Sequence, residues 1–137
     1  MALMPPANGL RAIWSLYGIT AFVNPPYGRR ITGLWIEKCV EAAKLGMAVV
    51  ALVPSRTDTI WWHELVRPTA QAICSWKGRI HFIGAKHGAP FPSALIYWGY
   101  ESQRFKSAFQ SKGAVEILRR APRHGNNLRQ GKLPIAA

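Results

Sequence analysis

The sequence predicts an α/β domain with a mostly parallel sheet that ends in an antiparallel hairpin. Two β-rich runs, residues 18–24 and 47–54, flank an amphipathic segment at residues 31–45, which is the strand–helix–strand order of a parallel sheet. With 137 residues, 49% of them hydrophobic, the chain is long enough for one compact core. We therefore expect one domain over residues 1–120 and a flexible basic tail over residues 121–137.

The first strand–helix–strand unit follows from local signals. Residues 18–24 are rich in β-formers and stop at a double proline, as a strand entering a loop does. Residues 31–45 place apolar side chains at helical spacing, and Gly46 follows as a helix terminator. Residues 47–54 are apolar at every position, which suits a strand covered on both faces. The pattern predicts a right-handed βαβ unit with its ligand chemistry at the carboxyl ends of the strands.

The second half of the domain is predicted from shorter runs. Residues 57–66 suggest a short helix, with Thr57 or Asp58 as its N-cap. A third strand is expected near residues 72–76. Two further β-like runs, residues 79–83 and 93–100, are predicted to pair as the antiparallel hairpin. A helix is expected after them, over residues 101–120.

Charge and composition indicate the class of partner. The chain has 18 Lys and Arg against 6 Asp and Glu, a net charge of +12, and the basic excess is densest after residue 100. A polyanion is the natural partner. The longest apolar run is too short to span a membrane, and the two cysteines lack zinc-site spacing, so we expect no metal, buried thiols and a cytoplasmic protein.

The tetrapeptide Asn24-Pro25-Pro26-Tyr27 is the candidate catalytic loop. An exocyclic adenine amine is a poor nucleophile because its lone pair is delocalised into the ring, and acceptors on its two hydrogens would localise that pair. The Asn24 amide oxygen and the Pro25 carbonyl can supply these acceptors from one loop that the prolines stiffen. The Tyr27 ring offers a face on which an extruded base can stack.

Other residues are candidates for contacts with DNA. Gly28 permits a sharp exit from the loop, and Arg29 and Arg30 follow where phosphates would flank the extruded nucleotide. Phe91 is either a second stacking face or a hydrophobic plug. Arg56 is a candidate for a contact with the target or the cofactor. Lys77 and Arg79 would suit phosphate contacts, although solvated surface cations look the same in sequence.

Several ordered blocks resemble the phage-type DNA N-6-adenine methyltransferases, a Dam-like family. They are residues 22–29 (FVNPPYGR), 52–59 (LVPSRTDT) with 62–64 (WHE), 77–82 (KGRIHF) and 89–94 (APFPSA). The resemblance implies a Rossmann-like methyltransferase fold, S-adenosylmethionine as the methyl donor and adenine in DNA as the acceptor. It also implies Asn24 to Tyr27 as the catalytic loop, and Phe22 and Asn24 next to the cofactor.

One part of the family pattern is not found in this sequence. The family's acidic donor-binding segment precedes the catalytic loop, whereas here 23 residues precede Asn24 and residues 1–21 contain no acid. We therefore expect an incomplete cofactor site, completed by oligomerisation or by a partner subunit if the chain is active. The alternatives are a non-catalytic DNA-binding remnant of such an enzyme, and a methyltransferase that acts on RNA or on protein glutamine.

Overall fold

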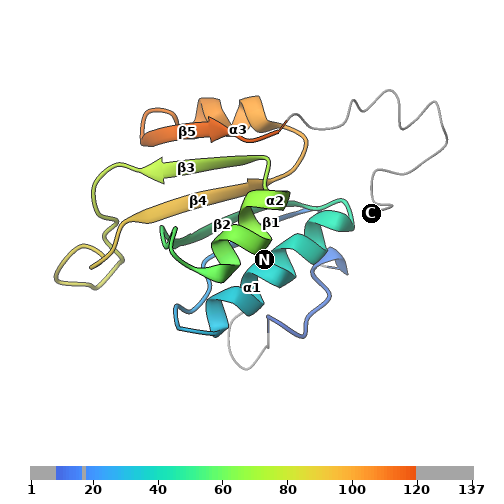
Figure 1. Ribbon diagram of the computed structural model, residues 1–137, viewed down its shortest axis with the longest axis horizontal. Helices are drawn as coiled ribbons and strands as arrows, with labels where there is room; N and C mark the ends of the chain where they lie inside the picture. The colour runs from blue at the N-terminus through green and yellow to red at the C-terminus, as the bar shows by residue number, and fades with distance from the viewer. Residues whose placement is uncertain (1–8, 17, 120–137) are drawn as a thin grey trace.

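The computed structural model describes residues 9–16 and 18–119, and in them five strands form one mixed sheet (Figure 1). The order across the sheet is β1-β2-β4-β3-β5. The strands are β1 (Thr20–Val23), β2 (Ala48–Pro54), β3 (Ala72–Trp76), β4 (Ser93–Trp98) and β5 (Gly113–Ile117). The helical elements are the 3-10 turn η1 (Trp14–Leu16), α1 (Ile31–Lys44), the π-helical η2 (Trp62–Val66), α2 (Arg67–Thr69) and α3 (Ser102–Phe109).

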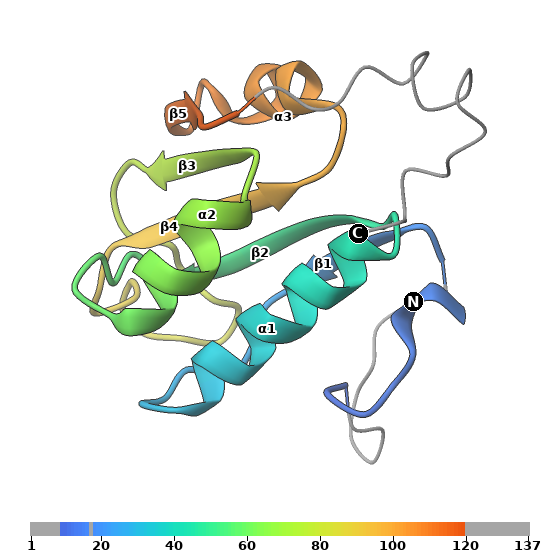
Figure 2. The same cartoon turned by 45° about the vertical axis from the view of Figure 1, so that its right-hand side comes forward.

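The predicted strand–helix–strand unit at the start of the domain is confirmed. β1 and β2 pair in parallel, with Phe22 opposite Val50, and α1 connects them. Figure 2 shows α1 lying across one face of the sheet. Ile36 and Cys39 on α1 are fully buried together with Val49 of β2. Burial of these apolar side chains fixes the helix against the strands, because apolar area removed from water contributes about 25 cal/mol per Å².

The expectation of a mostly parallel sheet is wrong. β4 lies between β2 and β3 and pairs antiparallel with both, and β5 pairs antiparallel with β3. β1, β2 and β3 therefore run in one direction, and β4 and β5 in the other. The physical reason is that a long loop, residues 77–92, lets β4 turn back and insert beside β2. The carboxyl ends of β1, β2 and β3 share one edge with the beginning of β4.

The predicted hairpin exists, but its first strand was misassigned. β4 pairs with β3, and residues 79–83 form part of the connecting loop. Gly78 and Gly84 bracket this segment with φ values of +80° and +83°, a left-handed conformation that interrupts an extended strand. Ile80 and Phe82 alternate as they would in a strand, yet they are half-buried and pack on the core from within the loop.

The helix predicted over residues 101–120 is also shorter than expected. α3 ends at Phe109, and the chain returns as β5. Half-buried Val115 and Ile117 alternate there with exposed neighbours, which is the period of a strand. At Gly113 a Cβ atom would lie 2.1 Å from the Ser75 carbonyl oxygen, so the strand start accommodates only glycine. The tail predicted over residues 121–137 lies outside the described residues.

The second predicted helix is displaced along the chain. It covers residues 60–69 and includes the π-helical turn η2. Neither Thr57 nor Asp58 caps it. The Thr59 hydroxyl instead accepts a hydrogen bond from the Trp62 backbone N–H at 3.4 Å and donates to the Arg56 carbonyl at 2.7 Å. The cap is one residue later than predicted, which leaves the Asp58 carboxylate to pair with Arg56.

Two apolar clusters lie on the two faces of the sheet. The first joins α1, η2 and the sheet residues that face them, and the second joins Leu52, Leu95 and Tyr97 to Phe105 of α3. Both cysteines are free and buried, as predicted. Within residues 9–16 and 18–119, no helix is both long and apolar enough to cross a membrane.

Candidate active site

Three loops meet at the edge where β1, β2 and β3 end. Residues 24–30 follow β1, residues 55–59 follow β2 and residues 77–92 follow β3. The backbone N–H of Ser55 donates to the Pro92 carbonyl at 2.8 Å, so the end of β2 is tied directly to the loop that enters β4. All residues predicted to form the site, except Phe22 at the end of β1, belong to these loops.

Asn24 and Tyr27 are joined by a hydrogen bond within the first loop. The Tyr27 hydroxyl donates to Asn24 Oδ1 at 2.9 Å and also reaches the Leu52 carbonyl oxygen at 3.3 Å. Pro25 is buried, whereas Asn24 and Pro26 are exposed. Burial raises the pKa of Tyr27, so its hydroxyl keeps its proton and remains a donor at neutral pH. The loop is thus anchored through Tyr27 and Pro25, while the Asn24 amide faces solvent.

Phe91 approaches Tyr27 from the loop before β4. Their ring centroids are 5.2 Å apart with an interplanar angle of 79°, an edge-to-face contact. Both side chains are half-buried, so each keeps some surface toward solvent. The structure therefore brings together two aromatic side chains 64 positions apart in the sequence, next to the Asn24 amide.

Thr32 holds the exit of the loop in place, and the sequence analysis did not identify it. Its side chain is 3% exposed, and its hydroxyl exchanges hydrogen bonds of 3.2 Å with the Gly28 N–H and carbonyl oxygen. Gly28 does not adopt a left-handed φ, so it is not required for the sharp turn as expected. An added Cβ would instead meet the Ile31 side chain at 3.0 Å. The four-residue spacing of Gly28 and Thr32 was the available signal.

Arg29 and Arg30 are exposed at the start of α1. The first turn of this helix contains no acidic residue, and in the structure no side chain caps it. The N-terminus of a helix carries a partial positive charge, which adds to the charge of the two arginines. This part of the edge is therefore suited to bind anions.

Arg56 and Asp58 form an ion pair on the second loop. Arg56 Nε donates to Asp58 Oδ1 and Nη2 donates to Oδ2, each at 3.0 Å. The pair lowers the pKa of the Asp58 carboxyl and raises that of Arg56, in both cases chiefly through these hydrogen bonds. Both side chains are more than half exposed, so the pair contributes little to stability.

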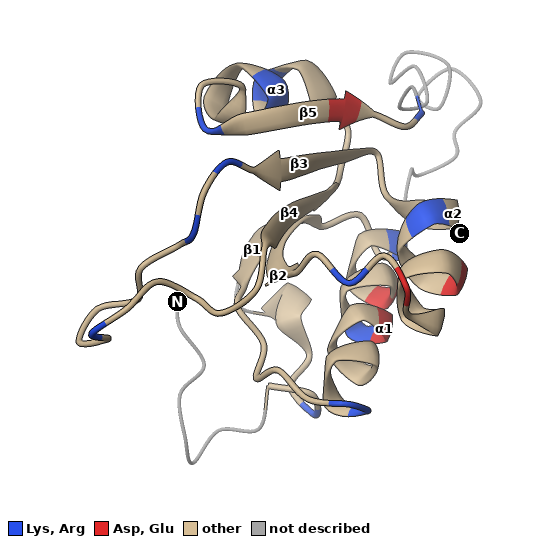
Figure 3. Cartoon of the chain, turned by 60° about the vertical axis from the view of Figure 1, so that its left-hand side comes forward, with Lys and Arg blue, Asp and Glu red and all other residues tan. Residues whose placement is uncertain are grey.

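The third loop is cationic throughout. Residues 77–92 contain Lys77, Arg79 and Lys86 and no acid, and all three cations are exposed. The Lys77 N–H donates to the Lys112 carbonyl at 2.9 Å, which fixes the start of the loop beside β5. Figure 3 shows basic positions and no acidic ones along this loop; the acidic positions lie on other segments, α1 and β5 among them.

The distribution of charge favours this edge as the polyanion-binding surface. Its three loops contain six of the 18 Lys and Arg residues of the chain but one of the six acids, Asp58. The other five acids lie outside these loops; they are Glu37, Glu41, Glu64, Glu101 and Glu116. A phosphate backbone approaching the Asn24 amide would therefore meet mostly positive charge.

A family model for DNA N-6-adenine-methyltransferase (Dam) matches residues 3–95. The chain belongs to this family. The matched range contains all three loops and every residue predicted to form the site, and it ends within β4. A comparison with curated proteins finds no match.

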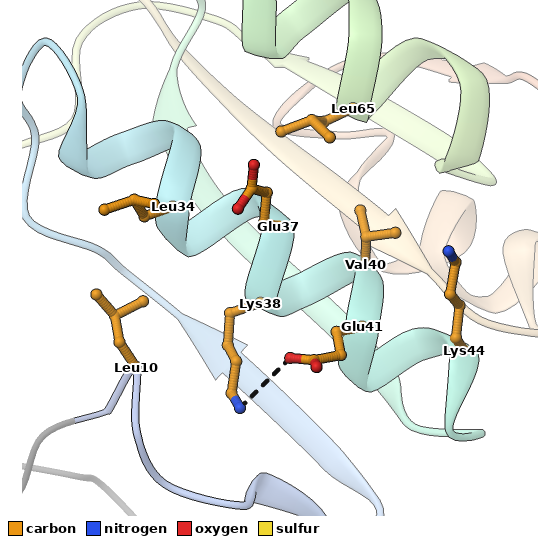
Figure 4. A pocket seen from close by; sticks show the side chains of 8 residues that line it. All are labelled: Leu10, Leu34, Glu37, Lys38, Val40, Glu41, Lys44 and Leu65. Carbon is orange, nitrogen blue, oxygen red and sulfur yellow. Dashed lines mark ion pairs between the residues drawn. The ribbon is translucent and has the colours of Figure 1, made fainter.

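In this Dam-family chain a cavity of about 520 Å³ lies elsewhere, on the outer face of α1 (Figure 4). Leu10 and Leu65 approach α1 from opposite sides, and the ion pair between Lys38 and Glu41 (3.6 Å) lines the cavity from α1 itself. No residue of the loop 24–30 lines this cavity. It is therefore separate from the candidate active site. Among the described residues, no group of three or more His, Cys, Asp or Glu side chains is arranged to hold a metal ion.

Proposed function

We propose that this chain transfers a methyl group to the exocyclic amino nitrogen of an adenine extruded from DNA. The observation that supports this most directly is the grouping of the Asn24 amide with the Tyr27 and Phe91 rings, at an edge rich in positive charge. An amide acceptor beside aromatic surface suits a purine amine, and the surrounding cations suit the phosphates that flank it.

Asn24 Oδ1 and the Pro25 carbonyl accept hydrogen bonds from the two hydrogens of the amine. These bonds localise the nitrogen lone pair and direct it out of the ring conjugation, so the nitrogen can attack the methyl carbon of a sulfonium donor. The carbon–sulfur bond breaks as the nitrogen–carbon bond forms, and the methylated amine then loses one proton to solvent. The Tyr27 hydroxyl, 2.9 Å from Asn24 Oδ1, orients the amide before the base arrives. A carbonyl-type oxygen has two lone pairs, so Asn24 Oδ1 can accept from Tyr27 and from adenine together.

The half-buried rings of Tyr27 and Phe91 provide the surface that holds the base. Extruding a base costs a few kcal/mol in lost stacking and pairing. Stacking on aromatic side chains returns about 1–3 kcal/mol per base, which offsets much of that cost. In the edge-to-face arrangement the Phe91 ring lies beside the Tyr27 ring, where it can contact a base that stacks on Tyr27. We therefore assign both residues to base binding.

The cationic residues of the edge bind the DNA backbone around the extruded nucleotide. Arg29 and Arg30, at the N-terminus of α1, lie beside Gly28 at the loop exit and meet the nearest phosphates. Lys77 and Arg79 extend the contact along the loop after β3. Contacts of this kind position the protein without selecting a sequence, and they make binding dependent on salt.

S-adenosylmethionine is the donor that the family normally uses, and it supplies a methyl group on a positively charged sulfur that leaves as a neutral thioether. The described residues fit this group in part. Phe22 is 66% exposed and is the last residue but one of β1, the strand that leads to Asn24, so it offers apolar surface close to that amide. Asp58, the one carboxylate in the three loops, is paired with Arg56, so these loops supply no unpaired carboxylate for the ribose hydroxyls.

Methyl transfer tests the proposal directly. The full chain is incubated with labelled S-adenosylmethionine and, side by side, with duplex DNA, RNA and protein, and N6-methyladenine is identified by mass spectrometry. We expect methylation of DNA that Asn24→Ala abolishes. Asn24→Asp is the matched control, because a carboxylate can still accept from the amine and from Tyr27. Binding of DNA should be nearly equal in the three proteins.

Other outcomes distinguish the alternatives. DNA binding without transfer would support a DNA-binding protein that has lost catalysis. A signal confined to RNA or to protein glutamine would assign a different substrate to the same loop. Undiminished transfer by Asn24→Ala would contradict the catalytic assignment itself.

A further inference from the structure

We infer that Arg56, held by Asp58, recognises a guanine base edge in the DNA next to the target adenine. This inference rests on the proposed function, because it requires a duplex at the edge that contains Asn24. It adds a residue that determines sequence specificity to a site whose other cations contact phosphates.

The hydrogen bonds of the pair define which part of the guanidinium remains available. Asp58 occupies the side edge of Arg56, through Nε and one hydrogen of Nη2, at 3.0 Å each. The end edge, formed by Nη1 and the second hydrogen of Nη2, has no protein partner among the described residues. Two parallel N–H groups at that edge match the O6 and N7 acceptors of guanine in the major groove.

The charge of the pair argues for a base contact over a phosphate contact. Arg56 and Asp58 together are formally neutral, so the pair adds little to the attraction of phosphates, and the Asp58 carboxylate would repel them. The end edge of the Arg56 guanidinium nevertheless keeps its capacity to donate hydrogen bonds. Lone pairs left on the carboxylate can also accept from the amino group of cytosine or adenine in a neighbouring pair.

The loop that presents Arg56 is held at several points. The Arg56 N–H donates to the Pro54 carbonyl at 2.8 Å, and its carbonyl accepts from the Thr59 hydroxyl at 2.7 Å. A ring nitrogen of His63 lies 2.7 Å from the Thr57 carbonyl oxygen. A pre-organised donor pair loses less conformational entropy on binding, which favours a specific contact from an exposed side chain.

The loop is also connected to the residues around the extruded base. Ser55, the neighbour of Arg56, donates to the carbonyl of Pro92, and Phe91 precedes Pro92 and contacts Tyr27. Arg56 is therefore at the rim of the base-binding surface, where the base pairs that remain stacked beside an extruded adenine would lie.

The test is a binding selection that does not depend on catalysis. The full chain is equilibrated with a library of DNA duplexes that have one fixed adenine and random flanks, and the bound fraction is sequenced. Wild type, Arg56→Lys and Asp58→Asn are compared with Arg67→Lys, which alters another surface ion pair, with Glu116 on β5. Lysine keeps the positive charge and loses the two parallel N–H donors of the guanidinium.

We expect wild type and Arg67→Lys to enrich guanine at one fixed position near the adenine. Arg56→Lys should lose this preference by roughly 5- to 150-fold, the range of one bidentate contact, with an unchanged salt dependence of binding. Asp58→Asn should weaken the guanine preference to an intermediate degree, since a neutral amide orients the Arg56 guanidinium less firmly than the carboxylate does.

Three results would overturn the inference: a wild type with no guanine preference, an Arg56→Lys profile equal to that of wild type, or a uniform loss across all sequences with a lower salt slope, which marks a phosphate contact. A guanine preference that depends on Arg56, without methyl transfer to the same library, would contradict the proposed function and leave the assignment of Arg56 intact.

Discussion

Replacing Tyr27 by phenylalanine separates the two roles assigned to this side chain. The substitution removes the hydroxyl that bonds Asn24 Oδ1 at 2.9 Å and Leu52 at 3.3 Å, and it keeps the ring that contacts Phe91. A hydrogen bond of this kind contributes about 0.5–1.5 kcal/mol. If that energy orients the Asn24 amide for attack, the rate of transfer should fall about 2- to 13-fold, since about 1.4 kcal/mol is tenfold in rate.

Single-turnover methyl transfer at saturating DNA measures this rate, and urea denaturation measures the free energy of unfolding. We expect the single-turnover rate to fall. The DNA concentration that gives half of the maximal rate, from the same assay at varied DNA, should stay within about twofold, because the stacking surface remains. Stability should fall by about 1 kcal/mol. Tyr97→Phe is the matched control: its hydroxyl accepts from the Glu101 N–H at 3.0 Å, toward the end of β4 that is opposite to the candidate active site.

Tyr97→Phe should lose a similar amount of stability and keep the wild-type rate. An unchanged rate in Tyr27→Phe would refute the positioning role of the hydroxyl. An equal loss of rate in both variants would attribute the effect to general destabilisation.

Three further predictions address DNA binding, burial and the core. Replacing Lys77 and Arg79 by alanine should lower affinity equally for all DNA sequences and reduce the slope of log affinity against log salt by about 2, whereas Lys44→Ala at the far end of α1 should not; titrations at several salt concentrations measure both. Burial raises the pKa of Cys39 to about 12, so iodoacetamide at pH 9 should leave this thiol unmodified in the folded protein and alkylate it in urea, as peptide mass spectrometry would show. The same shift means that stability falls as the pH rises above the pKa of the unfolded thiol, because only the unfolded chain ionises there. Ile96→Ala, in the middle of β4 and fully buried, should cost about 2–5 kcal/mol in urea unfolding; a loss below about 1 kcal/mol would contradict the central position of this strand.

Local sequence patterns determined the elements that are close together along the chain. The run that ends at Asn24, the amphipathic helix after it and the apolar strand at residues 48–54 each satisfy their own periodicity, so each could be predicted without its neighbours. The tetrapeptide after β1 and its proposed acceptor chemistry could be predicted in the same way, because that prediction depends only on adjacent residues.

Only the tertiary structure decided which segments pair as strands and which loops come into contact. Residues 79–83 and 113–117 have the same alternating pattern, yet the first forms a loop and the second a strand, because β3 offered one free edge to β5 while β4 filled the other. The contact between Tyr27 and Phe91 joins two loops through the pairing of β2 with β4, and no local propensity encodes that pairing. Long-range pairing depends on the burial of both sheet faces at once, which is a property of the whole core.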